Sequence, residues 1–347
     1  MPLRGPDRGP DRRVVVGLGL ATLASGRAFA RTSRPQVQIN LAGQSPAPPS
    51  PDGRPVLIRA GADPSSRMSV PVRLNDQGPY TFVVDTGANR SVVAIEAAEA
   101  LKLPAGEPMA VHGIAGIESA NTVMVSSLSV GEVRSSDLNL PILSTDHLGA
   151  QGLLGVDIMK NRHVVLDFVA NALVIGPARH DPDARAALEQ PTRILGEPRG
   201  VISIPARYRF GQLTIVDADV AGVPVTAFLD SGSQNTVANL ALRNAILGRQ
   251  PRLATQMRPV ELLSATGQTA DGEACVLPSL RLGGLWIGNL GAVFSDLHTF
   301  DVWQLQDRPA ILIGVDVLRH FDAVELDFNR KRVVFHAPRS ATTFYGN

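Results

Sequence analysis

The chain contains two copies of one sequence pattern, and this duplication constrains its fold more than any other feature. In the first copy the apolar run FVV ends at Asp85-Thr86-Gly87, and in the second the run AFL ends at Asp230-Ser231-Gly232. Further along, "GLLGVDIMKNRHVVLDF" matches "ILIGVDVLRHFDAVELDF" almost element by element. A repeat of this length indicates two structural units built in the same order.

Most of each copy has the pattern of β-structure. Both copies open with strand pairs and then carry a glycine-containing hairpin candidate, "AVHGIAGIESANTVMV" in the first and "ELLSATGQTADGEACV" in the second. Alternating or β-branched runs bounded by glycine turns predict strands. Only short helical segments are expected after each D-[ST]-G and each L-[LI]-G. The predicted fold class is therefore mostly β, with two homologous lobes.

Composition marks the borders of these lobes, since "GQSPAPPSPDGRP" and "PARHDPDARAALEQPTR" are polar and lack apolar periodicity. The predicted order is a signal peptide (1–30), a Pro-rich linker (31–66), a first lobe (67–178), a linker (179–198), a second lobe (199–338) and a tail (339–347). Ordered structure is expected to begin near Met68. A short helix is expected at "PDARAALEQ", within the second linker.

The N-terminus has the pattern of an export signal. A charged segment, "RGPDRR", precedes the apolar run "VVVGLGLATLAS", and Ala28-Phe29-Ala30 fits an A-x-A cleavage site. This apolar run is too short to span a bilayer comfortably. Arg12-Arg13 favours the twin-arginine route, but such pairs also occur in ordinary signals, which leaves the route open. We expect a periplasmic or secreted protein without membrane attachment once the signal is removed.

Charge and composition exclude several classes of partner. Beyond residue 30 the chain carries 28 basic and 30 acidic residues without a basic run, so nucleic acid is not an expected partner. The single cysteine excludes an internal disulfide, and the seven histidines lack H-x-x-x-H spacing. We therefore expect no metal and no cofactor. Cys275, in the apolar stretch "ACVLP", is predicted to be a buried structural thiol, and the histidines to lie at the surface or in turns.

The duplicated aspartates suggest a specific chemistry. A loop that delivers one carboxylate per copy can bring Asp85 and Asp230 face to face across a pseudo-two-fold axis. Two carboxylates about 3 Å apart cannot both ionise easily, so they share a proton. The ionised member can then act as general base on a water molecule, and the protonated member can donate a hydrogen bond to a carbonyl under attack.

Two pairs of motifs carry a family resemblance: "VVDTGA" with "LLG" (153–155), and "FLDSGS" with "LIG" (312–314). They resemble the retropepsin-like and pepsin-like aspartic proteases over nearly all of residues 68–335. The resemblance implies two retropepsin-like units fused in one chain, as in bacterial exported relatives, with a bilobal closed-barrel fold. It also implies an endopeptidase that cleaves peptides or unfolded proteins. Because both aspartates are in one chain, we expect an active monomer.

The resemblance also assigns roles to individual residues. Asp85 and Asp230 would be the catalytic pair, and Thr86 and Ser231 would cross-link the two loops through their hydroxyl groups. The loops would be supported by Thr86, Gly87, Ser231, Gly232 and Ser233, and the flap over the substrate would contain Gly113, Ile114, Gly116, Thr266 and Gly267. The chain departs from pepsin-like enzymes in having no tyrosine between Tyr80 and Tyr208, and therefore no flap tyrosine.

The two aspartate loops differ at one position. Ser233 follows the second loop and is expected to donate its hydroxyl hydrogen bond to Asp230, whereas Ala88 has no side-chain donor. On this basis Asp230 would be the more acidic member and Asp85 the proton holder. The repeated aspartates of "GVD" and "LDF" are interpreted as helix-start and turn carboxylates: Asp157, Asp316, Asp167 and Asp327.

Two other hypotheses remain open at the level of sequence. One is an exported peptide-binding or assembly module, catalytically weak or inactive on the same fold, because a fold alone does not guarantee activity. The other is a pair of β-domains that never meet. Retention of both aspartates, each with its Thr/Ser-Gly successor, favours the enzyme.

Overall fold

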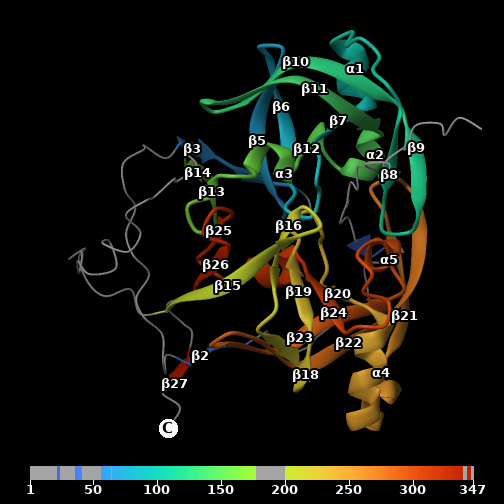
Figure 1. Cartoon of the computed structure of the whole chain (residues 1–347), viewed down its shortest axis with the longest axis vertical. Helices are drawn as coiled ribbons and strands as arrows, with labels where there is room; N and C mark the ends of the chain where they lie inside the picture. The colour runs from blue at the N-terminus through green and yellow to red at the C-terminus, as the bar shows by residue number, and fades with distance from the viewer. Residues whose placement is uncertain are drawn as a thin grey trace, which may run out of the picture.

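The computed structural model describes residues 56–63, 65–176 and 200–338, together with the backbone of residues 22–23, 36–40 and 342–344. The protein is mostly β and has two lobes, with the first lobe at the top of Figure 1 and the second at the bottom. The mostly β, two-lobed fold expected from the sequence is confirmed. The lobes are in contact, which excludes the hypothesis of two β-domains that never meet.

The first lobe is a closed six-stranded barrel. Its strands are β5 (Met68–Leu74), β6 (Gln77–Val84), β7 (Val92–Ala94), β10 (Thr122–Val130), β11 (Val133–Leu143) and β12 (Gly152–Leu154). They pair in the closed order β5–β6–β12–β7–β11–β10, and β10 returns to β5. The short β4 (Gly61–Ala62) pairs antiparallel with β5, and β8 (Met109–His112) pairs with β9 (Ile117–Ala120) as a separate hairpin.

The second lobe repeats this order with two of its strands broken. β16 (Gln212–Ile215) and β17 (Ala218–Val220) replace β5, and β18 (Val223–Pro224) and β19 (Thr226–Leu229) replace β6. The remaining strands are β20 (Val237–Ala238), β21 (Arg258–Leu263), β22 (Thr269–Leu282), β23 (Leu285–Ser295) and β24 (Ala310–Ile313). The ring runs β19–β24–β20–β23–β22–β17, so β19 and β24 are parallel neighbours as β6 and β12 are.

A third sheet joins the lobes. It is antiparallel in the order β3 (Val56–Arg59), β14 (Ala172–Gly176), β13 (His163–Asp167), β25 (Ala323–Asp327), β26 (Arg332–His336) and β15 (Val201–Arg209). The pairing of β13 with β25 connects the first lobe to the second, and β15 continues into the second barrel by pairing with β16. The lobes are therefore held by backbone hydrogen bonds as well as by packing.

Helices are short and lie at the ends of strands. They are α1 (Ile95–Ala100), α2 (Thr145–Leu148), α3 (Val156–Met159), α4 (Leu240–Arg249), a 3₁₀ helix (Pro251–Gln256), α5 (His298–Val302) and α6 (Val315–Leu318). Helices α3 and α6 follow β12 and β24 directly, as the two L-[LI]-G motifs predicted. Within the described ranges, no helix has the length and apolar character needed to cross a bilayer.

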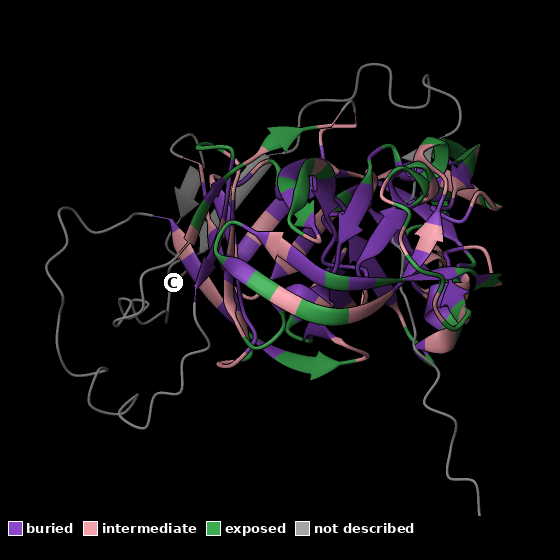
Figure 2. Cartoon of the chain, turned by 90° about the horizontal axis from the view of Figure 1, so that it is seen from above, coloured by how far each residue is buried: buried purple, intermediate pink, exposed green. Residues whose placement is uncertain are grey.

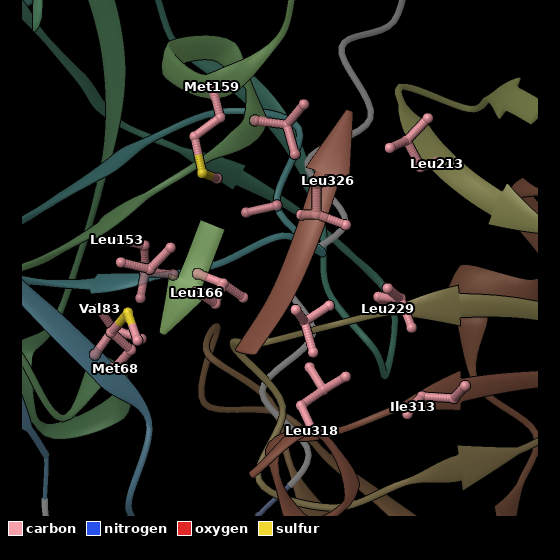
Figure 3. Packing of buried hydrophobic residues seen from close by; sticks show 14 of the residues in the cluster. Met68, Val83, Leu153, Met159, Leu166, Leu213, Leu229, Ile313, Leu318 and Leu326 are labelled. Carbon is pink, nitrogen blue, oxygen red and sulfur yellow. The ribbon is translucent and has the colours of Figure 1, made fainter. Parts of the chain in front are cut away.

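The hydrophobic core is continuous between the lobes. Buried residues fill the interior of the molecule in Figure 2. In Figure 3 the core extends from the first lobe across the shared sheet to the second lobe, through Val83, Leu153, Leu166, Leu326, Leu229 and Ile313. A shared core fixes how the lobes face each other, and therefore where the ends of β6 and β19 meet.

The predicted borders need correction. Strands β3 and β4 lie inside the predicted linker, so ordered structure begins before Met68. β3 is ordered as an edge strand that pairs with β14. Strand β2 (Gln36–Asn40) also lies there, and it pairs with β27 (Thr342–Phe344) inside the predicted tail. β1 (Thr22–Leu23) pairs with β21. The other residues of the predicted signal peptide, the Pro-rich stretch 43–55 and the linker 179–198 with its expected helix lie outside the described residues.

Candidate active site

Asp85 and Asp230 stand at the ends of matching strands. Asp85 follows β6 and its N–H donates to the carbonyl of Leu154, at 3.0 Å; Asp230 follows β19 and donates likewise to Ile313, at 2.9 Å. Both aspartates are fully buried. The parallel neighbours β12 and β24 therefore hold each aspartate where its strand leaves the barrel.

The two loops that carry these aspartates press against each other. A Cβ atom at Gly87 would lie 2.4 Å from Cγ of Asp230, and one at Gly232 would lie 2.3 Å from Cγ of Asp85. Neither glycine has a positive φ angle. Glycine is thus required here by the close approach of the opposite carboxyl group rather than by an unusual backbone conformation.

Backbone donors hold one oxygen of each carboxyl group. Oδ1 of Asp85 accepts hydrogen bonds from the N–H groups of Gly87 and Ala88, at 2.8 and 2.9 Å. Oδ1 of Asp230 accepts from the equivalent N–H groups of its own loop, at 3.0 and 3.1 Å. Oδ2 of each carboxyl group is buried and has no hydrogen-bond partner among the described residues. Since a carboxylate only accepts, the two groups can hydrogen-bond to each other only when one of them is protonated.

The loops are cross-linked by hydroxyl groups, as the family resemblance implied. Oγ1 of Thr86 donates to the carbonyl of Leu229 at 2.8 Å and accepts from the N–H of Ser231 at 3.0 Å. In return, Oγ of Ser231 donates to the carbonyl of Val84 at 2.7 Å and accepts from the N–H of Thr86 at 3.1 Å. Because this network is buried and reciprocal, it fixes the separation of the two aspartates.

The expected role of the Ser233 hydroxyl is wrong. Its Oγ donates to the carbonyl of Asn235 at 2.8 Å instead of to Asp230. The main-chain N–H of Ser233 bonds Oδ1 of Asp230, as the N–H of Ala88 does for Asp85. Both loops thus offer the same donors, and the difference between the aspartates has another origin.

Burial raises the pKa of both aspartates, which favours one shared proton in the pair. Burial raises the pKa of Asp85 to about 6, an effect partly opposed by the N–H groups of Ala88 and Gly87 and by the positive charge of Arg67. Burial and the negative charge of Asp85 raise the pKa of Asp230 well above its ordinary value. Of the two carboxyl groups, Asp85 is the one whose ionised form the positive charge of Arg67 stabilises.

Two residues that hydrogen-bond to the loops were not predicted from the sequence. Nη1 of Arg67 donates to the carbonyl of Gly232 at 3.4 Å, and Nε2 of Gln212 donates to the carbonyl of Gly87. Both side chains are buried. An alignment of the two repeats would have placed them at equivalent positions, but their contacts cross between lobes and have no local sequence signal.

The aspartates of the two "GVD" motifs are hydrogen-bonded to the segments that follow the Asp85 and Asp230 loops. Oγ of Ser91 donates to Oδ1 of Asp157 at 2.8 Å and accepts from the N–H of Gly155 at 3.0 Å. In the second lobe, Thr236 makes the same pair of contacts with Asp316 and with the equivalent glycine, at 2.9 and 3.1 Å. Burial raises the pKa of Asp157, and that of Asp316 to about 6. These helix-start carboxylates are structural, as predicted.

The aspartates of the two "LDF" motifs are turn carboxylates, as predicted. Oδ1 of Asp167 accepts from the N–H groups of Val169 and Ala170, at 3.1 and 2.7 Å. Oδ1 of Asp327 accepts from the N–H of Arg330, at 2.9 Å. Both therefore stabilise the turns that follow β13 and β25.

The expected flap residues meet at the boundary between the lobes. The β8–β9 hairpin reaches from the first lobe to the vicinity of β21 and α5 (Figure 1). Its Ile114 is buried in an apolar cluster of the second lobe that includes Phe228 and Trp303, and the N–H of His298 donates to the Ile114 carbonyl at 2.8 Å. This hairpin is thus docked on the opposite lobe.

The turn between β21 and β22 lies against this docked hairpin. A Cβ atom at Gly113 would lie 2.8 Å from Oγ1 of Thr266, and one at Gly116 would lie 3.2 Å from Oε1 of Gln268. A Cβ atom at Gly267 would collide with the ring of His147, 2.3 Å away. The five residues expected to form the flap are therefore brought together from both lobes.

The prediction for the histidines is wrong at His112. It is buried, and its Nδ1 lies 3.0 Å from Nε2 of His298, with the two rings stacked. Cys275 is buried, as predicted, and burial raises the pKa of its thiol to about 11, which keeps it unreactive. In the part of the chain that the structure describes, no three His, Cys, Asp or Glu side chains are grouped to hold a metal ion.

The comparison with known families agrees with this geometry. A family model described as aspartyl protease matches residues 70–158 and 216–317, once in each lobe. Each match contains one D-[ST]-G motif and one L-[LI]-G motif, as expected of two fused retropepsin-like units. No curated protein matches the chain at a significant level. Two matches that together span more than half of the sequence show that the chain belongs to the aspartyl protease family.

Proposed function

We propose that the protein is an exported aspartic endopeptidase that hydrolyses extended peptide segments with a water molecule activated by Asp85 and Asp230. The observation that carries the proposal is the pairing of two buried carboxyl groups in reciprocally bonded loops. Such a pair holds one proton between two acids, which supplies a base and an acid at the same place.

The proposed proton transfers start with Asp85 ionised and Asp230 protonated. Ionised Asp85 takes a proton from water as the water oxygen attacks the peptide carbonyl carbon. Protonated Asp230 gives its proton to the carbonyl oxygen, which leaves a tetrahedral diol. Asp85 then protonates the leaving nitrogen, and Asp230 recovers a proton from the diol as the C–N bond breaks. The pair returns to its starting state.

The loops contribute rigidity to this cycle. Thr86 and Ser231 are each bonded to the opposite lobe, so neither aspartate can move independently. Gly87 and Gly232 leave no space between the loops for a side chain. Fixed placement of reacting groups lowers the barrier because their orientation does not have to be achieved in the transition state.

Export and a monomeric active state belong to the same proposal. The A-x-A site at residues 28–30 supports export and predicts a mature N-terminus at Arg31. Both aspartates lie on one chain, so a second copy is not needed to complete the pair. N-terminal sequencing of the exported protein tests the first point. Specific activity that does not change on dilution is expected for the second.

A peptide-library digest tests the activity itself. The wild type is compared at several pH values with Asp85→Asn, Asp230→Asn and the control Asp307→Asn, which changes an exposed carboxylate. Cleavage by the wild type and the control, but by neither loop variant, is expected. Binding of library peptides without cleavage by the wild type would instead identify a peptide-binding module on the same fold.

A further inference from the structure

Arg67 and Gln212 occupy equivalent positions in the two lobes. Each lies 18 residues before the aspartate of its own lobe. Each is buried and donates a side-chain hydrogen bond to the main-chain carbonyl of the glycine in the opposite aspartate loop. The two contacts are related by the pseudo-two-fold symmetry of the protein, yet one donor is a cation and the other a neutral amide.

This difference in charge lies beside the dyad. Gly232, the acceptor for Arg67, packs directly on the carboxyl group of Asp85. Gly87, the acceptor for Gln212, packs in the same way on Asp230. The guanidinium group is therefore on the Asp85 side of the pair, and the amide is on the Asp230 side.

The guanidinium group is fixed in place. Asp63 accepts from Nε of Arg67 at 2.7 Å and lies 2.5 Å from its Nη2, which also donates to the carbonyl of Leu148 at 2.8 Å. A Cβ atom at Gly149 would lie 2.8 Å from the same Nη2, so glycine makes room for the cation. The planar guanidinium group thus bonds three parts of the molecule at once, which a lysine ammonium group cannot do with the same geometry.

We propose that Arg67 is a positioning residue that makes the two aspartates unequal, holding Asp85 as the carboxylate and leaving the shared proton on Asp230. The proposal rests on the proposed hydrolytic function. Asp63 opposes the charge of Arg67, and Asp157 and Asp316 are the acids in the first turns of the helices that follow β12 and β24. The positive charge of Arg67 lowers the pKa of Asp85.

The test removes the cation without leaving a buried charge alone. In the double variant Arg67→Gln/Asp63→Asn both lobes carry glutamine at the equivalent position. Without the cation the carboxylate is less stable, so the acid limb of kcat/KM on an extended peptide should move to higher pH, by roughly half to one pH unit. The double variant Arg134→Gln/Asp76→Asn, which removes an exposed ion pair from the same lobe, should leave the limb in place.

Two further measurements complete the test. Arg67→Lys keeps the charge and should keep the acid limb within about a quarter of a pH unit of the wild type. A uniform loss of kcat/KM in the Arg67→Gln/Asp63→Asn variant, with its acid limb unmoved, would show a merely structural role and overturn the proposal.

Titration of the wild type keeps the proposal testable even if the variants do not fold. Carboxyl ¹³C NMR of aspartate-labelled protein, with signals assigned from Asp85→Asn and Asp230→Asn, should show Asp85 ionising before Asp230. The opposite order would overturn the proposal. Because this readout needs no turnover, an inactive wild type with the expected order would contradict the proposed function alone.

Discussion

The N–H of Ser231 donates a hydrogen bond to Oγ1 of Thr86, and the N–H of Thr86 donates to Oγ of Ser231, so the two residues bind each other across the lobes. Each hydroxyl group then donates to a carbonyl at the end of the opposite strand. No atom of this network belongs to the carboxyl groups themselves. The network therefore fixes the distance between Asp85 and Asp230 by holding the two loops together.

Thr86→Val should lower both stability and activity. The change keeps the shape of the side chain but leaves the N–H of Ser231 and the carbonyl of Leu229 buried without a partner. We expect a loss of about 1 to 3 kcal/mol in the free energy of unfolding, measured by urea denaturation, and a fall in kcat. Ser136→Ala, at an exposed position of β11, serves as the control. An unchanged kcat in a folded Thr86→Val protein would contradict a positioning role for the network.

Gly232→Ala should abolish activity. The added methyl group would lie 2.3 Å from Cγ of Asp85, so the loops must separate to accept it. Gly248→Ala in α4 is the matched control, because a Cβ atom there meets nothing within 4 Å; alanine at this position should stabilise the protein by up to about 1 kcal/mol. Both variants are assayed for peptide cleavage and thermal unfolding. Normal cleavage by Gly232→Ala would contradict the close contact of the loops.

Ion pairs on the third sheet, which joins the lobes, should keep the junction between the lobes stable in acid. Burial would raise the pKa of Glu325, but hydrogen bonds with His163 and His336 outweigh it and lower the pKa to about 2. A carboxyl group with a lowered pKa stabilises the fold above its unfolded pKa, near 4.5, and this contribution is lost as the pH falls through about 2.

Glu325→Gln measures that contribution. The variant should be less stable than the wild type by about 2 kcal/mol at pH 6, a figure reduced for the partial exposure of the side chain, and the difference should shrink toward zero near pH 2. Urea unfolding across this pH range provides the measurement, with the exposed Glu132→Gln as the control. A stability difference that does not depend on pH would exclude this ion-pair account.

The docked hairpin offers a comparison within one element. Ile114 is buried in the second lobe, whereas Ile117, on the same hairpin, is about half exposed. We expect Ile114→Ala to cost about 2 to 4 kcal/mol of stability and to speed hydrogen exchange of the β8–β9 amides, while Ile117→Ala changes stability by less than about 0.5 kcal/mol. Equal exchange rates in the two variants would show that Ile114 does not anchor the hairpin.

The sequence predicted the structure where the information is local and repeated. The duplicated apolar-Asp-[Ser/Thr]-Gly runs predicted strands that end in paired loops, and the "GVD" and "LDF" aspartates were correctly interpreted as structural. It failed where a contact depends on geometry between distant segments. The Ser233 hydroxyl had two acceptors within reach of its loop, and only the folded turn selects Asn235. Arg67 reaches Gly232 in the other lobe, and β3 pairs with β14 far along the chain.

If Asp85 and Asp230 act as one unit, removal of either carboxyl group should stop catalysis, and a kinetic comparison measures this. The kcat/KM for one cleaved peptide is measured for the wild type, Asp85→Asn, Asp230→Asn and the double variant. Since a base without its acid, or an acid without its base, completes no cycle, each single change should remove at least about 10⁴-fold of the activity. The double variant should be no worse than either single variant. Full activity in either single variant, or losses that multiply in the double variant, would show that the two aspartates do not act as one unit.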